Sequence, residues 1–397
     1  MDESNSRAAR QNNGFAAVTT SFVAVFAAGS TSIPLYDTYE RMDKLMATDF
    51  SIVTVAYFAC AVFALLVLGR LSNHLGRRPV TIATLLLGAA GTLTLIGVHG
   101  LAPLLIGRVL QGLAAGLAGS AIAAYTVDTA PKEPKWLAAT VTTTATTVGL
   151  SIGVFGSAVL VEFGPAPRAL TYLVFAAILV GCAIAIATRA ETVQPNPGAA
   201  HSLIPRLTVP DGARRYLPVA GCIFVATWAF GGYATSFGPS VAAGYLHSSS
   251  PVIAAAVFAS YMAPSVFGGP LTGRISPATT QRLGMILVTI AAVGFVSALT
   301  IGNAAVFIIA GILGGLGMGA GMSANMRILL PQAAPAQRAG LLAVIYAMSY
   351  LGAAIPSLIA GQLSRSISLL DITIGYGVLA ALACVVVLLG ARNPVAA

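Results

Sequence analysis

One arginine stands inside a long apolar stretch of this sequence. Arg108 falls within the run 102–124, and a cation inside a membrane-crossing helix costs from about 2.5 kcal/mol upward, so such charges are functional by default. At helical spacing the same face carries small and polar residues, namely Gln111, Gly112, Ala115, Gly116 and Gly119. The pattern predicts a functional site at Arg108 and Gln111, with Gly112 and Gly116 allowing close helix packing. The alternative is a structural arginine that the carbonyls of neighbouring helices satisfy.

One acid has the position that a proton site would need. Asp37 follows Pro34, Leu35 and Tyr36 at the end of the first apolar run, and burial favours the protonated form of a carboxylic acid. The alternative, equally supported, is an ordinary carboxylate in a wet loop beside Glu40. No acid lies in the middle of any apolar run, which weighs against proton exchange.

Aromatic residues within the apolar runs are candidates for a binding pocket. Any single aromatic side chain in such a run more often packs or faces lipid. Together they make an apolar pocket with hydrogen-bonding groups plausible. The candidates are Trp228, Tyr233, Tyr261, Tyr346 and Tyr350.

Motifs of enzymes and metal sites are missing from the sequence. It contains no GxxxxGK[ST] phosphate loop, no HExxH and no GxSxG. The four cysteines lie in apolar runs without a CxxC, and the four histidines lie in loops or near the ends of the runs. We therefore expect no enzymatic activity, no cofactor and no metal.

The composition identifies the elements that must position these residues. Of 397 residues, 57% are hydrophobic and 8% are charged, whereas soluble proteins carry about 25% charged residues. A soluble enzyme, a disordered chain and a nucleic-acid-binding module are excluded.

Helices of about 20 apolar residues cross a bilayer, and continuous rather than alternating apolarity favours helices over barrel strands. The sequence predicts an all-α polytopic membrane protein with twelve transmembrane helices, at about 15–36, 50–69, 79–98, 102–124, 137–161, 168–188, 216–243, 251–273, 281–300, 303–326, 339–361 and 371–390.

The basic residues predict the orientation. If the N-terminus is cytoplasmic, sixteen of the 21 Lys and Arg fall on the cytoplasmic side and four on the other, which is a strong positive-inside bias. The net charge of +9 is then a topology signal. We expect a multi-pass protein of the plasma (inner) membrane with both termini cytoplasmic.

An internal duplication divides the chain. Residues 69–72 recur as 273–276, and residues 110–113 match 313–316, at nearly constant offset. Between the halves lies a polar stretch rich in proline and arginine. The predicted organisation is an N-terminal tail, a six-helix bundle, a cytoplasmic linker, a second six-helix bundle and a C-terminal tail, at 1–14, 15–188, 189–215, 216–391 and 392–397.

The loop that begins at Gly69 carries a family resemblance. Residues 69–79 read GRLSNHLGRRP, which resembles the signature loop of the major facilitator superfamily. Residues 108–112 resemble that superfamily's second motif. The resemblance implies two pseudo-symmetric six-helix bundles, a substrate site near the midplane between them and a monomer. The subgroup that the chain resembles most is the twelve-span bacterial drug:proton antiporters.

The resemblance also assigns roles to residues. It implies proton coupling or substrate handling for Arg108, and a cytoplasmic gate in which Asp128 pairs with Arg77 and separates when the protein opens inward. Asn73 stands where the family usually has aspartate, so either the gate is weaker or Asp128 carries the pairing alone. The alternative is a loop that serves solvation and topology only. The predicted gate residues are Gly69, Asn73, Gly76, Arg77, Arg78 and Asp128.

The fifth run partly matches the antiporter motif of the drug-exporting subgroup. It carries Gly149 and Gly153, but Val154 replaces the motif's proline. Ordinary close packing of small residues explains the glycines equally well. In the equivalent eleventh run, Pro356 would permit a kink.

These features lead to a functional expectation. We expect a secondary transporter that works by alternating access and exports lipophilic or amphipathic small molecules, driven by protons. Uptake or facilitated diffusion of a polar or anionic solute stays open, as does a non-transporting membrane scaffold or receptor. The expected partners are a small-molecule substrate, protons and the lipid bilayer, and no nucleic acid.

Overall fold

A computed structural model describes most of the chain. It covers residues 2–131, 133, 137–205, 207, 209–248, 250–334 and 337–394, and the side chains of 2–12, 139, 338 and 339 are not described. Parts of the predicted tails and linker therefore lie outside the described residues. So do several basic side chains behind the orientation prediction, namely Arg7, Arg10, Lys132, Lys135, Arg206 and Arg338.

Regular structure in these described ranges is helical, without strands. Twelve helices there are long and apolar enough to cross a membrane, beginning with Asn13–Asp43 and ending with Leu369–Gly390. Each overlaps one of the twelve predicted runs. The predicted fold class is confirmed, and the chain is an integral multi-pass membrane protein.

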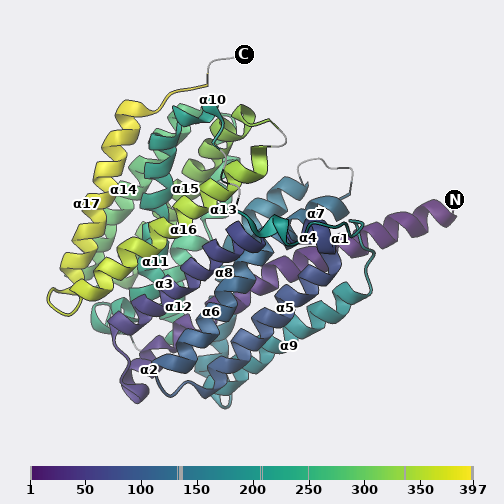
Figure 1. Cartoon of the computed structure of the whole chain (residues 1–397). Helices are drawn as coiled ribbons and strands as arrows, with labels where there is room; N and C mark the ends of the chain where they lie inside the picture. Colours follow the sequence, from purple (N-terminus) through teal and green to yellow (C-terminus); the bar gives the residue numbers. More distant parts are fainter. Residues whose placement is uncertain are drawn as a thin grey trace. The chain divides into compact units, whose positions relative to one another are not determined.

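The first of two compact units comprises residues 1–32 and 59–205. In it α1 packs against α8 and α9, and α5 packs against α6 and α9 (Figure 1). The second and fourth spans each contain a π-helical segment, at Ala64–Leu68 and Ala118–Ile122. The helices are α1 (Asp2–Ser30), the end of α3 (Ala47–Phe63), α4 (Ser72–Leu75), α5 (Arg77–Thr94), α6 (Leu101–Leu117), α7 (Ala123–Thr129), α8 (Leu137–Phe163) and α9 (Pro167–Ala187).

The second unit comprises residues 33–58 and 206–397. In it α14 packs against α15 and α17, and α11 packs against α12 and α16. Residues 33–58, which the sequence placed in the first bundle, group with this unit. Its helices are α2 (Tyr36–Asp43), the first part of α3, α10 (Asp211–Arg214), α11 (Leu217–Gly244), α12 (Pro251–Met262), α13 (Ser265–Thr272), α14 (Pro277–Ile301), α15 (Ala304–Leu329), α16 (Arg338–Leu363) and α17 (Leu369–Gly390).

Glycines allow the helices of the first unit to approach closely. A Cβ on Gly116 would collide with the carbonyl oxygen of Ala61, and one on Gly153 would collide with that of Ala27. A Cβ on Gly149 would lie 2.6 Å from the carbonyl oxygen of Val23. The contacts of α6 with α3 and of α8 with α1 therefore depend on these missing side chains.

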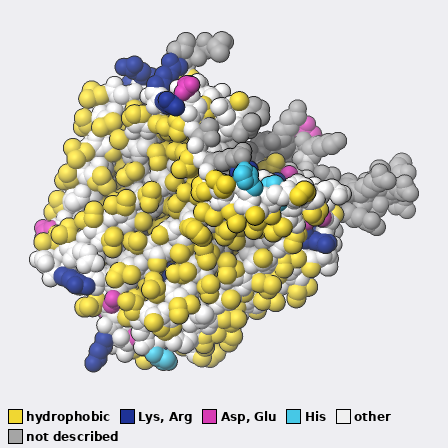
Figure 2. Space-filling view, viewed as in Figure 1, with side chains coloured by type: hydrophobic (Ala, Val, Ile, Leu, Met, Phe, Trp, Pro, Cys, Tyr) yellow, Lys and Arg dark blue, Asp and Glu magenta, His cyan; other side chains and the backbone are white. Residues whose placement is uncertain are grey.

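The outer faces of the helices are apolar. On α17, Leu382 and Leu389 are 62% and 81% exposed, and Figure 2 shows hydrophobic side chains over this part of the second unit, with Lys and Arg gathered at its ends. Exposed apolar surface of this extent indicates contact with lipid. Within α16, Pro356 is accommodated without ending the helix.

Candidate functional site

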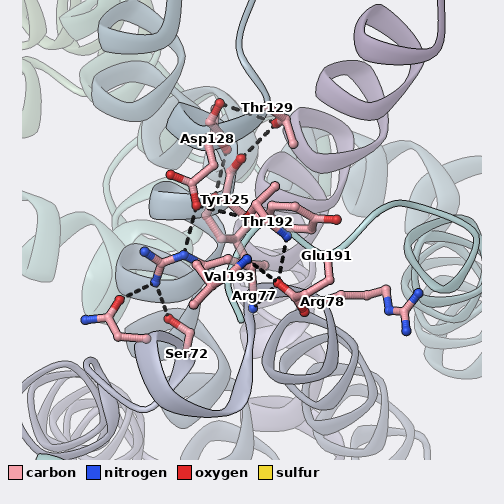
Figure 3. A network of polar contacts seen from close by, with 12 residues as sticks. Ser72, Arg77, Arg78, Tyr125, Asp128, Thr129, Glu191, Thr192 and Val193 are labelled. Atoms are coloured by element: carbon pink, nitrogen blue, oxygen red, sulfur yellow. Dashed lines mark hydrogen bonds and ion pairs between the residues drawn. The ribbon is translucent and has the colours of Figure 1, made fainter. Parts of the chain in front are cut away.

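The first unit contains a polar network centred on Arg77, at the start of α5. The Nε atom of Arg77 donates to Oδ2 of Asp128 over 3.0 Å, and its Nη1 donates to Oδ1 of Asn73 over 2.6 Å and to Oγ of Ser72 over 2.7 Å (Figure 3). The side chains of Arg77 and Asp128 are 13% and 32% exposed. The structure thus brings three of the predicted gate residues together, and their role as a gate stays a prediction.

Glu191, which the sequence did not single out, completes this network. Its Oε1 accepts the backbone N–H of Arg77 at 2.8 Å, and its Oε2 accepts that of Arg78 at 3.0 Å. The first N–H groups of a helix lack partners within the helix, and negative charge is favourable there. Glu191 therefore caps the N-terminus of α5. Two features of the sequence could have indicated this cap. Glu191 is an acid just beyond the sixth run, and Gly76 is a glycine directly before α5, where a residue with a capping side chain is usual.

Gly76 has a conformation and surroundings that favour glycine. Its φ is +99°, a left-handed value that side chains rarely adopt. A Cβ at this position would lie 2.5 Å from Oε2 of Glu191. The glycine of the signature loop therefore makes room for the cap that Glu191 provides.

The chain after α9 is bound to the same network. Thr192 donates from its hydroxyl to Oδ2 of Asp128 over 3.0 Å, and the hydroxyl of Tyr125 donates to the carbonyl of Ala190 over 2.5 Å. The side chain of Arg78 donates to the carbonyl of Arg189 over 3.2 Å. We call Ser72, Asn73, Arg77, Arg78, Tyr125, Asp128, Glu191 and Thr192 the Arg77 network (Figure 3).

Gly69 lies just before this network, at the end of the second span. A Cβ added to it would lie 3.3 Å from Cβ of Ser120, in the second π-helical segment. It would also collide with the carbonyl oxygen of Leu65 in the preceding turn. Gly69 therefore allows a close approach to the fourth span, whereas the network itself begins at Ser72.

The second unit repeats the cap without an acidic side chain. Asn393, just beyond α17, accepts the backbone N–H of Ala278 with its Oδ1 at 3.0 Å, as Glu191 beyond α9 does for α5. The hydroxyl of Ser276 accepts the N–H of Thr279 at 3.3 Å. Arg327 donates to the carbonyl of Ile275 over 2.9 Å. The duplication thus extends to capping, but the acidic form of the cap belongs to the first unit.

Arg108 and Gln111 form a second polar cluster, buried in the first unit. Each is 2% exposed. Nη1 of Arg108 donates to the carbonyl of Gly29 and, over 3.0 Å, to Oε1 of Gln111, whose Nε2 donates to the carbonyl of Ala28 over 3.0 Å and to Oγ1 of Thr92 over 3.2 Å. Gly112 and Gly116, on the same helix, are buried as well.

This cluster has a structural explanation. Because α1 ends at Ser30, the carbonyls of Ala28 and Gly29 lack the amide partners that a continuing helix would supply, although Thr31 also donates to that of Ala28. A cation near a helix C-terminus is favourable. The contacts match the structural alternative that the sequence left open. A role of Arg108 in transport stays a prediction.

Asp37 lies in the first turn of α2 and forms an ion pair with Arg41, one turn later. Its side chain is 24% exposed and that of Arg41 58%. This is the geometry of an i,i+4 pair at a helix surface. A role of Asp37 in proton transfer stays a prediction.

The five aromatic candidates fall into two groups within the second unit. The hydroxyl of Tyr233 shares a hydrogen bond of 2.7 Å with Oγ1 of Thr373, and that of Tyr261 donates to the carbonyl of Thr227 over 2.8 Å. Both rings are buried, so this pair belongs to the packed interior of the unit. The other three candidates, Trp228, Tyr346 and Tyr350, form a separate cluster.

In the part of the chain that the structure describes, no three His, Cys, Asp or Glu side chains are grouped so that they could hold a metal ion. The four cysteines, Cys60, Cys182, Cys222 and Cys384, are free thiols.

Comparisons with known proteins agree on the fold. The model of the Major Facilitator Superfamily matches residues 15–237, more than half of the chain. Among solved structures, a crystal structure of a mutant of the nucleoside transporter NupG is similar with a TM-score of 0.71 and 11% identity, over 95% of this chain and 100% of that one. At this identity the likeness shows the fold alone. No curated protein matches the sequence significantly.

Proposed function

Because the chain belongs to the Major Facilitator Superfamily, we propose that it is a secondary transporter that exports lipophilic or amphipathic small molecules in exchange for protons. The family and the twelve spans support transport rather than catalysis. Export and proton coupling are the finer part of the proposal. They depend on the resemblance of the loop at Gly69 and of the glycines in α8 to those of drug:proton antiporters.

The observation that carries the transport mechanism is the Arg77 network. It joins the loop before α5, the end of α7 and the chain after α9 through one ion pair and several hydrogen bonds. Conformational transitions in proteins switch contacts between two discrete arrangements rather than deforming them gradually. A polar network at helix ends can therefore be either intact or broken, one arrangement in each state of the transporter. We propose that the network is intact in the outward-facing state and opens in the inward-facing state. The positive-inside bias supports a cytoplasmic position for it.

Arg108 and Gln111 are proposed to act on the coupling step. They hold the end of α1 by its last carbonyls, so a change in their hydrogen bonds would release that helix end. In this proposal the cluster couples proton or substrate binding to the position of α1.

A second candidate is uptake or facilitated diffusion of a polar solute. The similar solved structure is that of a nucleoside transporter, which supports this candidate. The acids of the sequence also stand near the ends of the predicted spans, and a proton exchanger commonly needs one inside the membrane.

Transport assays on proteoliposomes separate the candidates. We would impose a pH gradient in either direction and follow a panel that contains a lipophilic dye, a nucleoside and an organic anion. Export by exchange predicts that the dye moves against the proton flow and stops when the gradient is collapsed. Nucleoside movement that ignores the gradient would favour the second candidate, and no movement of any panel member would contradict both.

A matched pair of variants tests the network. Asp128→Asn removes the ion pair with Arg77, whereas Asp211→Asn removes the exposed pair with Arg214. We expect only Asp128→Asn to change the transport rate. An equal effect of both variants would contradict the role of the network.

A further inference from the structure

An aromatic cluster in the second unit joins three helices. Phe58 of α3, Trp228 of α11 and Tyr350 of α16 lie within 6.4 Å of one another, with ring centroids 6.4, 5.3 and 5.7 Å apart. Tyr57 and Tyr346 extend the group. Apart from Tyr346, these side chains are only 5–7% exposed. We call the five residues the Trp228 box.

The indole N–H of Trp228 is the exceptional group in this box. It is buried, and among the described residues it has no hydrogen-bond partner. A buried donor without an acceptor destabilises the folded chain, and such groups call for an explanation. The hydroxyls of Tyr233 and Tyr261, by contrast, each have a partner. The N–H of Trp228 is thus a buried donor within the box that an acceptor on a bound molecule would satisfy.

The surroundings of the box define the charge of that molecule. Aromatic faces bind planar rings and also bind cations. Helices α11 and α16 contain no acid, and the acid of α3, Asp49, is nine residues from Phe58, about 13 Å along a helix. Without a nearby carboxylate, a buried cation would lack a counter-charge, so a neutral ligand fits better.

We propose that the Trp228 box binds an uncharged, planar aromatic part of the transported molecule, and that the indole N–H donates to a carbonyl or ring-nitrogen acceptor on it. The proposal rests on the proposed function in one respect, since it takes the ligand to be the transported substrate. Binding itself needs no gradient and can be measured apart from transport.

Two probes of similar size isolate the hydrogen bond. Coumarin and naphthalene are both flat, neutral two-ring molecules, but only coumarin carries a carbonyl acceptor. Equilibrium dialysis of the radiolabelled probes against the purified protein in detergent should show that the wild type prefers coumarin. In Trp228→Phe, coumarin affinity should fall about fivefold to tenfold, as for the loss of about 1 kcal/mol. Naphthalene affinity should change by less than about twofold.

Controls distinguish the hydrogen bond from a general loss of structure. Retained naphthalene binding shows that Trp228→Phe is folded. Tyr233→Phe removes a hydroxyl that already has a protein partner, so it should leave both affinities unchanged. Because the chain has two tryptophans, Trp136→Phe leaves Trp228 as the single reporter, and coumarin should quench its fluorescence.

Three results would overturn the proposal: an unchanged ratio of the two affinities in Trp228→Phe, no coumarin binding by the wild type, or no quenching in Trp136→Phe. If the ratio falls as expected but proteoliposomes move no substrate, the box stands and the proposed transport fails. If transport occurs and the ratio is unchanged, transport stands and the box fails.

Discussion

Replacing Glu191 by glutamine tests the cap on α5 directly. The carboxylate of Glu191 accepts four backbone N–H groups, from Arg77 and Arg78 at the start of α5 and from Thr192 and Val193 beside it. Glutamine keeps one carbonyl oxygen and replaces the other by an amide group, which cannot accept. Glu191→Gln therefore leaves at least one N–H without its acceptor and removes a negative charge from a helix N-terminus.

The size of the effect follows from these two losses. A charge at a helix end contributes about 0.3–1 kcal/mol, and a hydrogen bond in a partly exposed site about 1 kcal/mol. Together they destabilise the bound form of the segment after α9 by about 1–2 kcal/mol, which is about 5- to 30-fold in its equilibrium with the released form.

Hydrogen exchange measured by mass spectrometry reports this release. The amides of Thr192, Val193 and Asn196 are hydrogen-bonded in the network region, and a peptide covering 190–198 should exchange about tenfold faster in Glu191→Gln. Glu162→Gln, a like change at an exposed position of the same unit, should leave this peptide unchanged. Exchange within twofold of the wild type in Glu191→Gln, or equal acceleration in the control, would refute the capping role.

The other predictions concern four single positions. Asn73→Asp adds a charge beside Arg77 and should stabilise the closed network by about 0.2–1 kcal/mol; slower exchange of 190–198 would show it, and no change would contradict it. Gly76→Ala should lower the unfolding temperature, because φ is +99° there and left-handed backbone costs a side chain about 1–3 kcal/mol; an unchanged melting curve argues otherwise. Arg108→Ala should abolish transport in proteoliposomes while the protein still reaches the membrane, and normal transport would remove Arg108 from the mechanism. Asp37→Asn should uncouple proton movement from transport, and proton release equal to that of the wild type on substrate addition would reject this role.

Local composition was enough to predict the helices. A helix that crosses lipid must bury about 20 apolar residues and pair its own amides, so each span is visible as one uninterrupted run. Because a charge inside a membrane-crossing helix is costly, Arg108 stood out within its apolar run. The loop at Gly69 resembles the signature loop of a known family, and that resemblance implied the pairing of Arg77 with Asp128.

The partners of these residues depended on distant parts of the chain. Glu191 is 114 residues from Arg77, and its position just beyond the sixth run does not by itself identify the helix that it caps. The sequence left open whether Arg108 is functional or structural, whereas the folded chain places the end of α1 against it. Residues 33–58 lie within the predicted first bundle, yet their contacts assign them to the second unit.

Trp228 and Tyr233, both on α11, differ in a way that only the structure shows. Both are aromatic residues with a single donor in an apolar run, and the sequence ranks them alike. Thr373, 140 residues away, satisfies Tyr233, while no described residue accepts from Trp228. Sequence alone determined which segments enter the membrane, because that depends on the apolarity of each segment. Tertiary packing decided which buried polar groups are already satisfied, because a hydrogen bond requires a second atom within about 3 Å.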